Sequence, residues 1–105
     1  MVGLDMEPDE DLPEEILDTV LTPLERAALR DLRQARLIFT IKEAAYKAQF
    51  PCSRQIFGFE VFEVRLSGDG FEAVFQQAIG PFQRGEGLFG RFGAAGGFVM
   101  AGLVL

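Results

Sequence analysis

The sequence predicts an α+β domain in which an antiparallel sheet of about four to five strands packs against two or three helices. Three observations predict this class. Apolar residues from Leu37 to Phe50 recur with the period of a helix. Alternating residues on both sides of the turn Ser67–Gly70 predict a β-hairpin. Eight of the twelve glycines lie from Gly80 onward, where two more strands joined by a glycine turn are expected.

The composition limits the classes of function. A chain of 105 residues that is 49% hydrophobic suits one packed domain, and a net charge of -6 argues against a nucleic-acid surface. Histidine is absent, which excludes histidine-based catalysis and histidine metal sites. The single cysteine, Cys52, excludes an internal disulfide and is typical of a reducing compartment. No signal peptide is visible, so we expect a cytoplasmic protein.

The first residues, Met1 to Met6, read as a strand that ends at Pro8. Asp5 and Glu7 share one face of it, opposite the apolar side chains. Two carboxylates this close repel each other unless a cation lies between them. Mg²⁺ is commonly held by one or two such carboxylates together with substrate phosphates. The alternative is a solvated acidic edge that continues into the acidic residues that follow.

A short helix is predicted from Pro13 to about Val20, and a second one from Pro23, where Thr22 and Glu25 form a capping box. We expect the break before the central helix at Leu32 to Arg36. Pro51 should end that helix at or before Phe50. Four arginines are spaced to line one side, where they either meet phosphate or an acidic partner or form a solvated face: Arg26, Arg30, Arg33 and Arg36.

The central helix has two faces. Its apolar sector, which should face the core, comprises Leu37, Ile38, Ile41, Ala44, Ala45 and Ala48. An aromatic ridge of Phe39, Tyr46 and Phe50 lies on the far side, with Glu43 and Lys47 beside it and Lys42 at its opposite edge. Either a ligand binds this second face, or Glu43 and Lys47 form an ordinary solvated pair at i and i+4.

Four strands are expected in the second half of the chain: Phe59 to Leu66, Phe71 to Gln76, Leu88 to Phe92 and Phe98 to Leu105. The glycine pattern at Gly85–Gly90 fits GxGxxG, but no predicted helix follows it, so we reject a dinucleotide site. The apolar stretch Phe92–Leu105 is too short to span a bilayer, so no membrane partner is expected.

Three stretches together resemble the 4'-phosphopantetheinyl transferases, in particular the C-terminal half of the enterobactin- and surfactin-synthase-activating type. That family has a GxDxE strand, which VGLDME at Val2–Glu7 resembles. It also has a (Trp/Phe)xxKExxxK helix, which FTIKEAAYK at Phe39–Lys47 resembles at a similar separation. The linking segment and the later strands are similar as well, so the resemblance covers residues 1–105 as one transferase-like domain.

The resemblance implies a function and roles for five residues. Asp5, Glu7 and Glu43 would hold Mg²⁺ against the pyrophosphate of coenzyme A, and Lys42 and Lys47 would meet its phosphates or assist proton transfer. The reaction would transfer the 4'-phosphopantetheine arm of coenzyme A to a serine of an acyl or peptidyl carrier protein. Such a transfer needs placement and charge neutralisation, which a metal ion and lysines supply. Glu43, or a water that it holds, would take the serine proton.

The sequence departs from the family in one respect. Two-domain members carry an N-terminal half with a histidine motif. Short relatives have a C-terminal histidine pattern and assemble identical chains around a shared site. This chain contains no histidine and therefore has neither pattern. We therefore expect either a half that needs a missing N-terminal half or a half that pairs with itself as a homo-oligomer. The alternatives from other classes are a non-catalytic half that binds a carrier protein through its arginines, and an unrelated acidic interaction domain.

Overall fold

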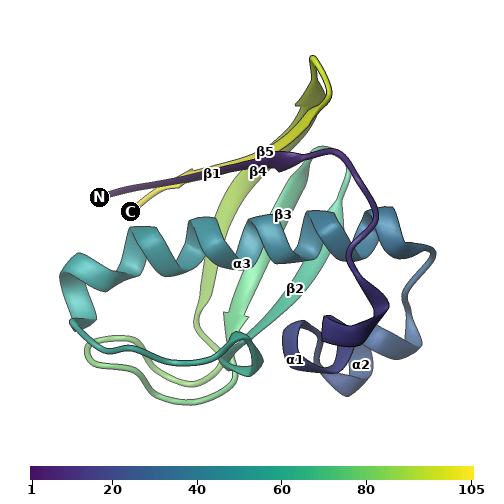
Figure 1. The fold of residues 1–105 in the computed structure, drawn as a ribbon. Coiled ribbons are helices and arrows are strands. Elements are labelled where there is room, and N and C mark those ends of the chain that lie inside the picture. The colour runs from purple at the N-terminus through teal and green to yellow at the C-terminus, as the bar shows by residue number, and fades with distance from the viewer.

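The computed structural model describes residues 1–105 and confirms the α+β class (Figure 1). One helix, α3 (Leu32–Ser53), runs across one face of a five-stranded antiparallel sheet. Two short helices, α1 (Leu17–Val20) and α2 (Pro23–Ala27), and the 3-10 turns η1 (Glu14–Ile16) and η2 (Phe59–Val61) complete the helical part. The strands are β1 (Val2–Pro8), β2 (Phe62–Ser67), β3 (Gly70–Phe75), β4 (Gly87–Ala95) and β5 (Phe98–Val104).

The two ends of the chain lie side by side in the sheet. Its strand order is β1-β5-β4-β3-β2, and every neighbouring pair is antiparallel. The backbone N–H of Leu105 donates to the Met1 carbonyl at 2.7 Å, and the Met1 amino group donates to the Leu105 carbonyl at 3.1 Å. β1 is therefore an edge strand whose neighbour in the sheet is the last strand of the chain, as Figure 1 shows.

The apolar sector predicted for the central helix is confirmed. Ile38, Ile41 and the alanines of the sector are buried against the sheet, and Leu37 is partly buried. The aromatic ridge is covered as well, because Phe57 packs edge-on against Tyr46 with ring centres 5.1 Å apart. The second face of α3 is therefore lined by the chain segment that follows the helix.

β1 lies so close to α3 that residue 3 must be glycine. A Cβ at Gly3 would lie 2.0 Å from the carbonyl oxygen of Ala44 and 2.7 Å from the Cβ of Ala48. Only a residue without a Cβ permits such a close backbone approach. Because side chains alternate along a strand, Asp5 and Glu7 share the face of Gly3 and point toward α3.

The boundaries of α3 differ from the predicted ones. The helix begins at Leu32, so the break lies just before the predicted interval, where the Asp31 side chain accepts from the Gln34 backbone N–H at 2.8 Å. The predicted end at Phe50 is wrong, because α3 continues through Pro51 to Ser53. Pro51 removes one helical donor, and its position near the helix end leaves few later bonds to disturb.

The other elements follow the prediction with small shifts. Both hydrogen bonds of the Thr22–Glu25 capping box are present at the start of α2. The strand expected from Phe59 begins at Phe62, because η2 occupies the three preceding residues. Gly96 and Gly97 form the last hairpin turn with φ angles of 62° and 82°. Residues 85–90 run into β4 and not into a helix. None of the helices is long and apolar enough to cross a bilayer.

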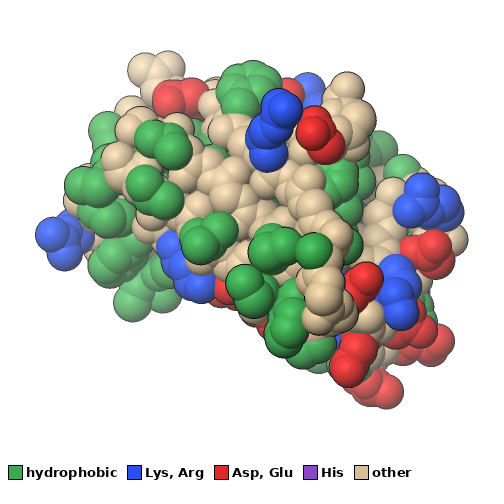
Figure 2. Space-filling view, turned by 90° about the horizontal axis from the view of Figure 1, so that it is seen from above, with side chains coloured by type: hydrophobic (Ala, Val, Ile, Leu, Met, Phe, Trp, Pro, Cys, Tyr) green, Lys and Arg blue, Asp and Glu red, His purple; other side chains and the backbone are tan.

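The side of the sheet facing away from α3 is apolar and exposed near β1. We call this surface the outer face and define it by Val2, Leu4, Met6, Phe89 and Val104, which are between 52% and 74% exposed. Figure 2 views the molecule from above and shows hydrophobic side chains gathered over its left and central parts, with acidic ones mainly at the right. β1 therefore carries its carboxylates toward the helix and its apolar residues toward solvent, the reverse of an ordinary edge strand.

Candidate active site

Asp5 and Lys47, which are 42 positions apart in the sequence, meet where β1 passes α3. Lys47 Nζ donates to Asp5 Oδ1 at 2.7 Å and to the Leu4 carbonyl at 3.3 Å. Asp5 is buried, whereas half of the Lys47 side chain is exposed. The hydrogen bond to Asp5 raises the pKa of Lys47 above its usual value of 10.5. The lysine is therefore charged at neutral pH and holds the strand carboxylate against the helix.

Glu7 and Glu43 lie within electrostatic reach of Asp5. Burial, followed by the neighbouring Asp5 carboxyl group, raises the pKa of Glu7 above 4.5, although Arg36 opposes the rise. Burial and the charge of Asp5 also raise the pKa of Glu43, and Lys47 opposes that rise. Three carboxyl groups thus share one region, and the nearby cations do not fully compensate their charge.

One oxygen of Asp5 is left without a partner in this surplus of negative charge. Asp5 Oδ2 is buried and has no hydrogen-bond partner. A bond between Asp5 and Glu7 forms only when one of them holds a proton. A hard divalent cation that prefers carboxylate oxygen would satisfy the same atom. As the side chains stand, no three acidic or cysteine side chains are close enough together to hold a metal ion. A Mg²⁺ site formed by Asp5, Glu7 and Glu43 therefore stays a prediction, and its formation requires side-chain movement.

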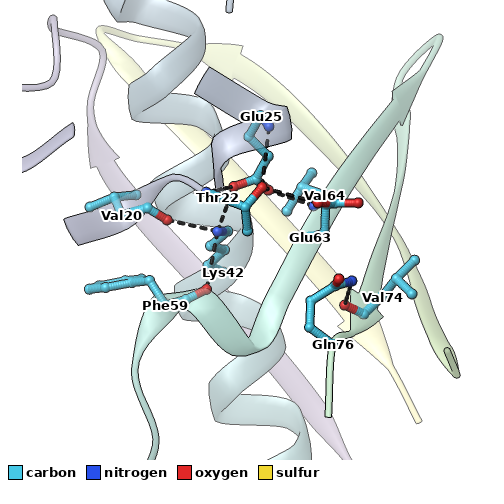
Figure 3. Close-up of polar contacts among 9 residues, drawn as sticks. All are labelled: Val20, Thr22, Glu25, Lys42, Phe59, Glu63, Val64, Val74 and Gln76. Carbon is cyan, nitrogen blue, oxygen red and sulfur yellow. Dashed lines mark hydrogen bonds and ion pairs between the residues drawn. The ribbon is translucent and has the colours of Figure 1, made fainter. Parts of the chain in front are cut away.

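Lys42, which the resemblance assigned to the phosphates of coenzyme A or to proton transfer, lies in a different environment (Figure 3). Its side chain is 1% exposed, and Nζ donates to Glu25 Oε1 and the Val20 carbonyl, both at 2.7 Å, and to the Phe59 carbonyl at 3.1 Å. An ammonium group has three donors, so no hydrogen remains for a phosphate. Burial lowers the pKa of Lys42 from 10.5, and Glu25 opposes this effect. The structure separates Lys42 from the cluster at Asp5.

A cleft borders Glu43 on the side of the aromatic ridge. It encloses about 260 Å³ and is lined mainly by apolar side chains. Tyr46 and Glu43 of α3 form one side, and Ile56, Phe57 and Phe59 of the following segment form the other. The arrangement places an apolar hollow of ligand size beside a carboxylate that has a raised pKa, which is typical of a binding site.

The predicted arginine stripe is largely neutralised by the chain itself. Arg26 pairs with Asp18, and Arg33 lies 3.4 Å from Asp9 and 3.6 Å from Asp11. Arg36 donates to the backbone carbonyls of the same acidic segment at 3.3 Å. The acidic linker after β1 therefore covers this side, which agrees with the solvated-face alternative rather than with a free anion-binding stripe.

Two parts of the site were not predicted from the sequence. One is Glu25, the buried partner of Lys42, whose only sequence signal was its capping-box position. The other is the wall of the cleft around Phe57, which lies between the predicted end of the helix and the next predicted strand. Its signal was the aromatic ridge of α3, since exposed rings in such a row need a covering segment.

The comparison with known families agrees with this geometry. The sequence profile of the 4'-phosphopantetheinyl transferase superfamily matches residues 1–93. The chain belongs to this superfamily. The match confirms the resemblance that the two motifs indicated, and it includes β1, α3 and all five predicted site residues.

Three curated 4'-phosphopantetheinyl transferases are similar to the chain. Npt from Nocardia iowensis is 35% identical over 118 aligned residues, which cover 97% of this chain and 53% of Npt. PptT from Mycobacterium tuberculosis is 38% identical over 73 residues, which cover 65% of this chain and 32% of PptT. Svp from Streptomyces mobaraensis is 30% identical over 115 residues, which cover 99% of this chain and 47% of Svp. The chain spans about half the length of Npt and of Svp.

Proposed function

We propose that this chain is the C-terminal half of a 4'-phosphopantetheinyl transferase and supplies its acid and lysine side chains. The activity proposed is Mg²⁺-dependent transfer of the 4'-phosphopantetheine arm of coenzyme A to a serine of an acyl or peptidyl carrier protein. The observation that carries the proposal is the meeting of Asp5 and Lys47, with Glu7 and Glu43 close by, in a chain of this superfamily.

In the proposed reaction, the serine hydroxyl oxygen attacks the β-phosphorus of the coenzyme A pyrophosphate. The new bond joins serine oxygen to phosphorus, and the bond from this phosphorus to the oxygen bridging to the α-phosphate breaks. Adenosine 3',5'-bisphosphate leaves with that oxygen. Glu43, directly or through a water, takes the serine proton, a role that suits a carboxyl group with a raised pKa.

The chain's other residues bind and orient the substrate. Lys47 lies half-exposed beside Asp5, so its ammonium group can turn to a phosphate oxygen without crossing the core. The cleft beside Glu43 offers an apolar surface for the pantetheine part of coenzyme A. When bound by Asp5, Glu7 and Glu43, Mg²⁺ supplies charge neutralisation of the pyrophosphate.

The outer face is the proposed docking surface for the rest of the enzyme. Large apolar side chains lie exposed there on neighbouring strands, and such patches on soluble domains usually mark an interface. The relatives Npt and Svp are about twice as long as this chain. We propose that either a separate N-terminal half or a second copy of this chain covers the outer face, with the cytoplasm as the site of action.

A transfer assay tests the proposed activity. The chain is incubated with coenzyme A, Mg²⁺ and an apo carrier protein, alone and together with an N-terminal half of Npt, and the carrier is weighed by mass spectrometry. We expect the carrier to gain the mass of the phosphopantetheine arm. The variant Glu43→Ala should transfer none. If the carrier binds but no condition produces transfer, the non-catalytic alternative replaces the proposal.

A binding measurement tests the metal assignment separately. Titration calorimetry with Mg²⁺ should give an affinity that Asp5→Ala and Glu43→Ala each lower by on the order of tenfold or more, as expected for the loss of a charged oxygen ligand. The surface variant Glu86→Ala serves as a control, since Glu86 lies in the turn before β4. Unchanged Mg²⁺ affinity in the two site variants would refute a metal site at these residues.

A further inference from the structure

Lys42 forms a buried ion pair that joins five elements of the fold. Its ammonium group, carried by α3, contacts the end of α1 through the Val20 carbonyl, α2 through Glu25 and η2 through the Phe59 carbonyl (Figure 3). Glu25 extends the connection, since its Oε1 accepts from the Thr22 N–H at 2.8 Å and its Oε2 from the Val64 N–H of β2 at 2.6 Å. All three donors of the ammonium group and both carboxylate oxygens are thus engaged.

Stability alone is a weak reason for such a pair. Removing two charges from water is expensive, and apolar residues of similar volume often stabilise a fold equally well or better. The side chains of Lys42 and Glu25 are only 1% and 2% exposed, so nearly the full desolvation penalty applies. What an ion pair provides, and an apolar contact does not, is one defined distance and direction between the groups that it joins.

The pair lies directly behind the cleft. Lys42 precedes Glu43 in the sequence, and both residues line the cleft. Phe59, whose carbonyl accepts from Lys42, stands on the opposite side, next to Gly58 and Phe57. Lys42 is therefore the polar link between the helix that carries Glu43 and the segment that faces it. The contacts Phe39–Phe59 and Tyr46–Phe57, at 5.5 and 5.1 Å between ring centres, are apolar and less directional than a charged hydrogen bond.

We propose that Lys42 is a positioning residue that fixes the Gly58–Phe59 wall of the cleft at a set distance from Glu43. The ammonium group of Lys42 donates to three protein acceptors and so binds neither a phosphate nor a metal ion. Its effect on the reaction passes through the shape of the cleft, so its loss should weaken coenzyme A binding more than it slows the chemical step. This inference rests on the proposed function for its kinetic part, whereas its structural part concerns the cleft alone.

The test uses the double variant Lys42→Met/Glu25→Gln. Methionine keeps the length of the lysine stem, and glutamine keeps a capping box at residue 25, so both charges leave together and no unpaired charge stays buried. Leu103→Ala on β5 is the control, because it loosens the core away from the cleft. Temperatures are chosen so that both variants lie equally far below their own melting points.

Tyr46 provides a readout that does not depend on activity. It is the single tyrosine of a chain without tryptophan, and it lines the cleft against Phe57. We expect acrylamide to quench its fluorescence more strongly in the double variant than in wild type, while Leu103→Ala matches wild type. In the transfer assay, the KM for coenzyme A should rise on the order of tenfold with a smaller change in kcat, since small misplacements weaken productive binding.

Equal quenching in the double variant and in Leu103→Ala would overturn the inference, since Lys42 would then act only on stability. A double variant with unchanged quenching and unchanged KM would overturn it as well. If the wild-type protein transfers nothing with any second half, the proposed function fails, and the tyrosine measurement still decides the role of Lys42.

Discussion

Gly3 determines how near the carboxylates of β1 come to α3. A Cβ at this position would collide with the Ala44 carbonyl at 2.0 Å, and a backbone atom cannot move aside as a side-chain tip can. The contact between Asp5 and Lys47 depends on this approach, because Asp5 is two residues further along the same face. The glycine of the GxDxE pattern therefore has a physical reason that does not involve the substrate.

We expect Gly3→Ala to push β1 away from α3 and to lower the free energy of unfolding by about 1–3 kcal/mol, as overpacking typically does. Urea unfolding measures this loss. Gly93→Ala on β4 is the matched control, because a Cβ there meets nothing within 4 Å. Equal stabilities of the two variants would show that the close approach is not needed.

Glu7 and Glu43 give the metal-free protein a defined pH dependence. Both pKa values are raised above 4.5, so the folded protein holds more protons than the unfolded chain between 4.5 and the raised values. The contribution of these two groups to stability is thus greatest at low pH and falls as pH rises through that window. Urea unfolding at a series of pH values without metal should show that Glu7→Gln/Glu43→Gln removes this component. An identical pH profile in the double variant would contradict the assignment.

At the scale of elements, α3 shows what local sequence signals can predict. Its apolar sector follows from periodicity, and the capping box of α2 follows from Thr22 and Glu25. The predicted end of the helix at or before Phe50 was wrong. Pro51 removes only one backbone hydrogen-bond donor, and the packing of the helix sustains one more turn. Asp31 was not predicted as the helix cap, because the pattern of apolar residues does not change at the loop before it.

The cap of α3 can be tested directly. Asp31→Ala should lower the free energy of unfolding by about 1 kcal/mol, because the Gln34 N–H loses its acceptor in the first turn. Asp31→Asn is the control, since asparagine caps helices about equally well and should stay within a few tenths of a kcal/mol of wild type. Thermal or urea unfolding followed by circular dichroism measures both. If Asp31→Asn lost as much stability as Asp31→Ala, the charge of Asp31 and not its capping hydrogen bond would be what stabilises the helix.

The candidate site could be predicted from the sequence only in part. Strand and helix periodicity place Asp5 with Glu7 and Glu43 with Lys47. Their assignment to one site came from the family resemblance, and it stays a prediction. The burial of Lys42 could not be predicted, because its neighbours Val20, Glu25 and Phe59 come from three separate segments that no spacing rule joins. Long-range placement decides whether a lysine beside a catalytic motif reaches solvent or the core.

At the scale of the whole molecule, the outer face leaves one side of the sheet uncovered near β1. The apolar side chains of β1 face solvent, and its polar ones face the helix. The core lies entirely on the α3 side of the sheet. Burying the outer face against a second half would give the sheet two covered faces.

The charge variant Leu4→Lys tests this arrangement. Leu4 is 61% exposed, so we expect the isolated chain to keep its fold and circular dichroism spectrum, while association with a second copy or an N-terminal half is lost. Light scattering coupled to size exclusion gives the mass of the assembly. Leu24→Lys on α2 is the control, since Leu24 is 64% exposed and lies away from the outer face. An unchanged assembly mass in Leu4→Lys would refute the docking surface.

The pairing of β1 with β5 has a consequence for folding. Asp5 and Glu7 lie on β1, whose neighbour in the sheet is the strand most distant from it in sequence. Closing such a long loop is slow compared with forming a local hairpin. We therefore expect the acids that would handle coenzyme A to be among the last side chains that reach their final positions during folding.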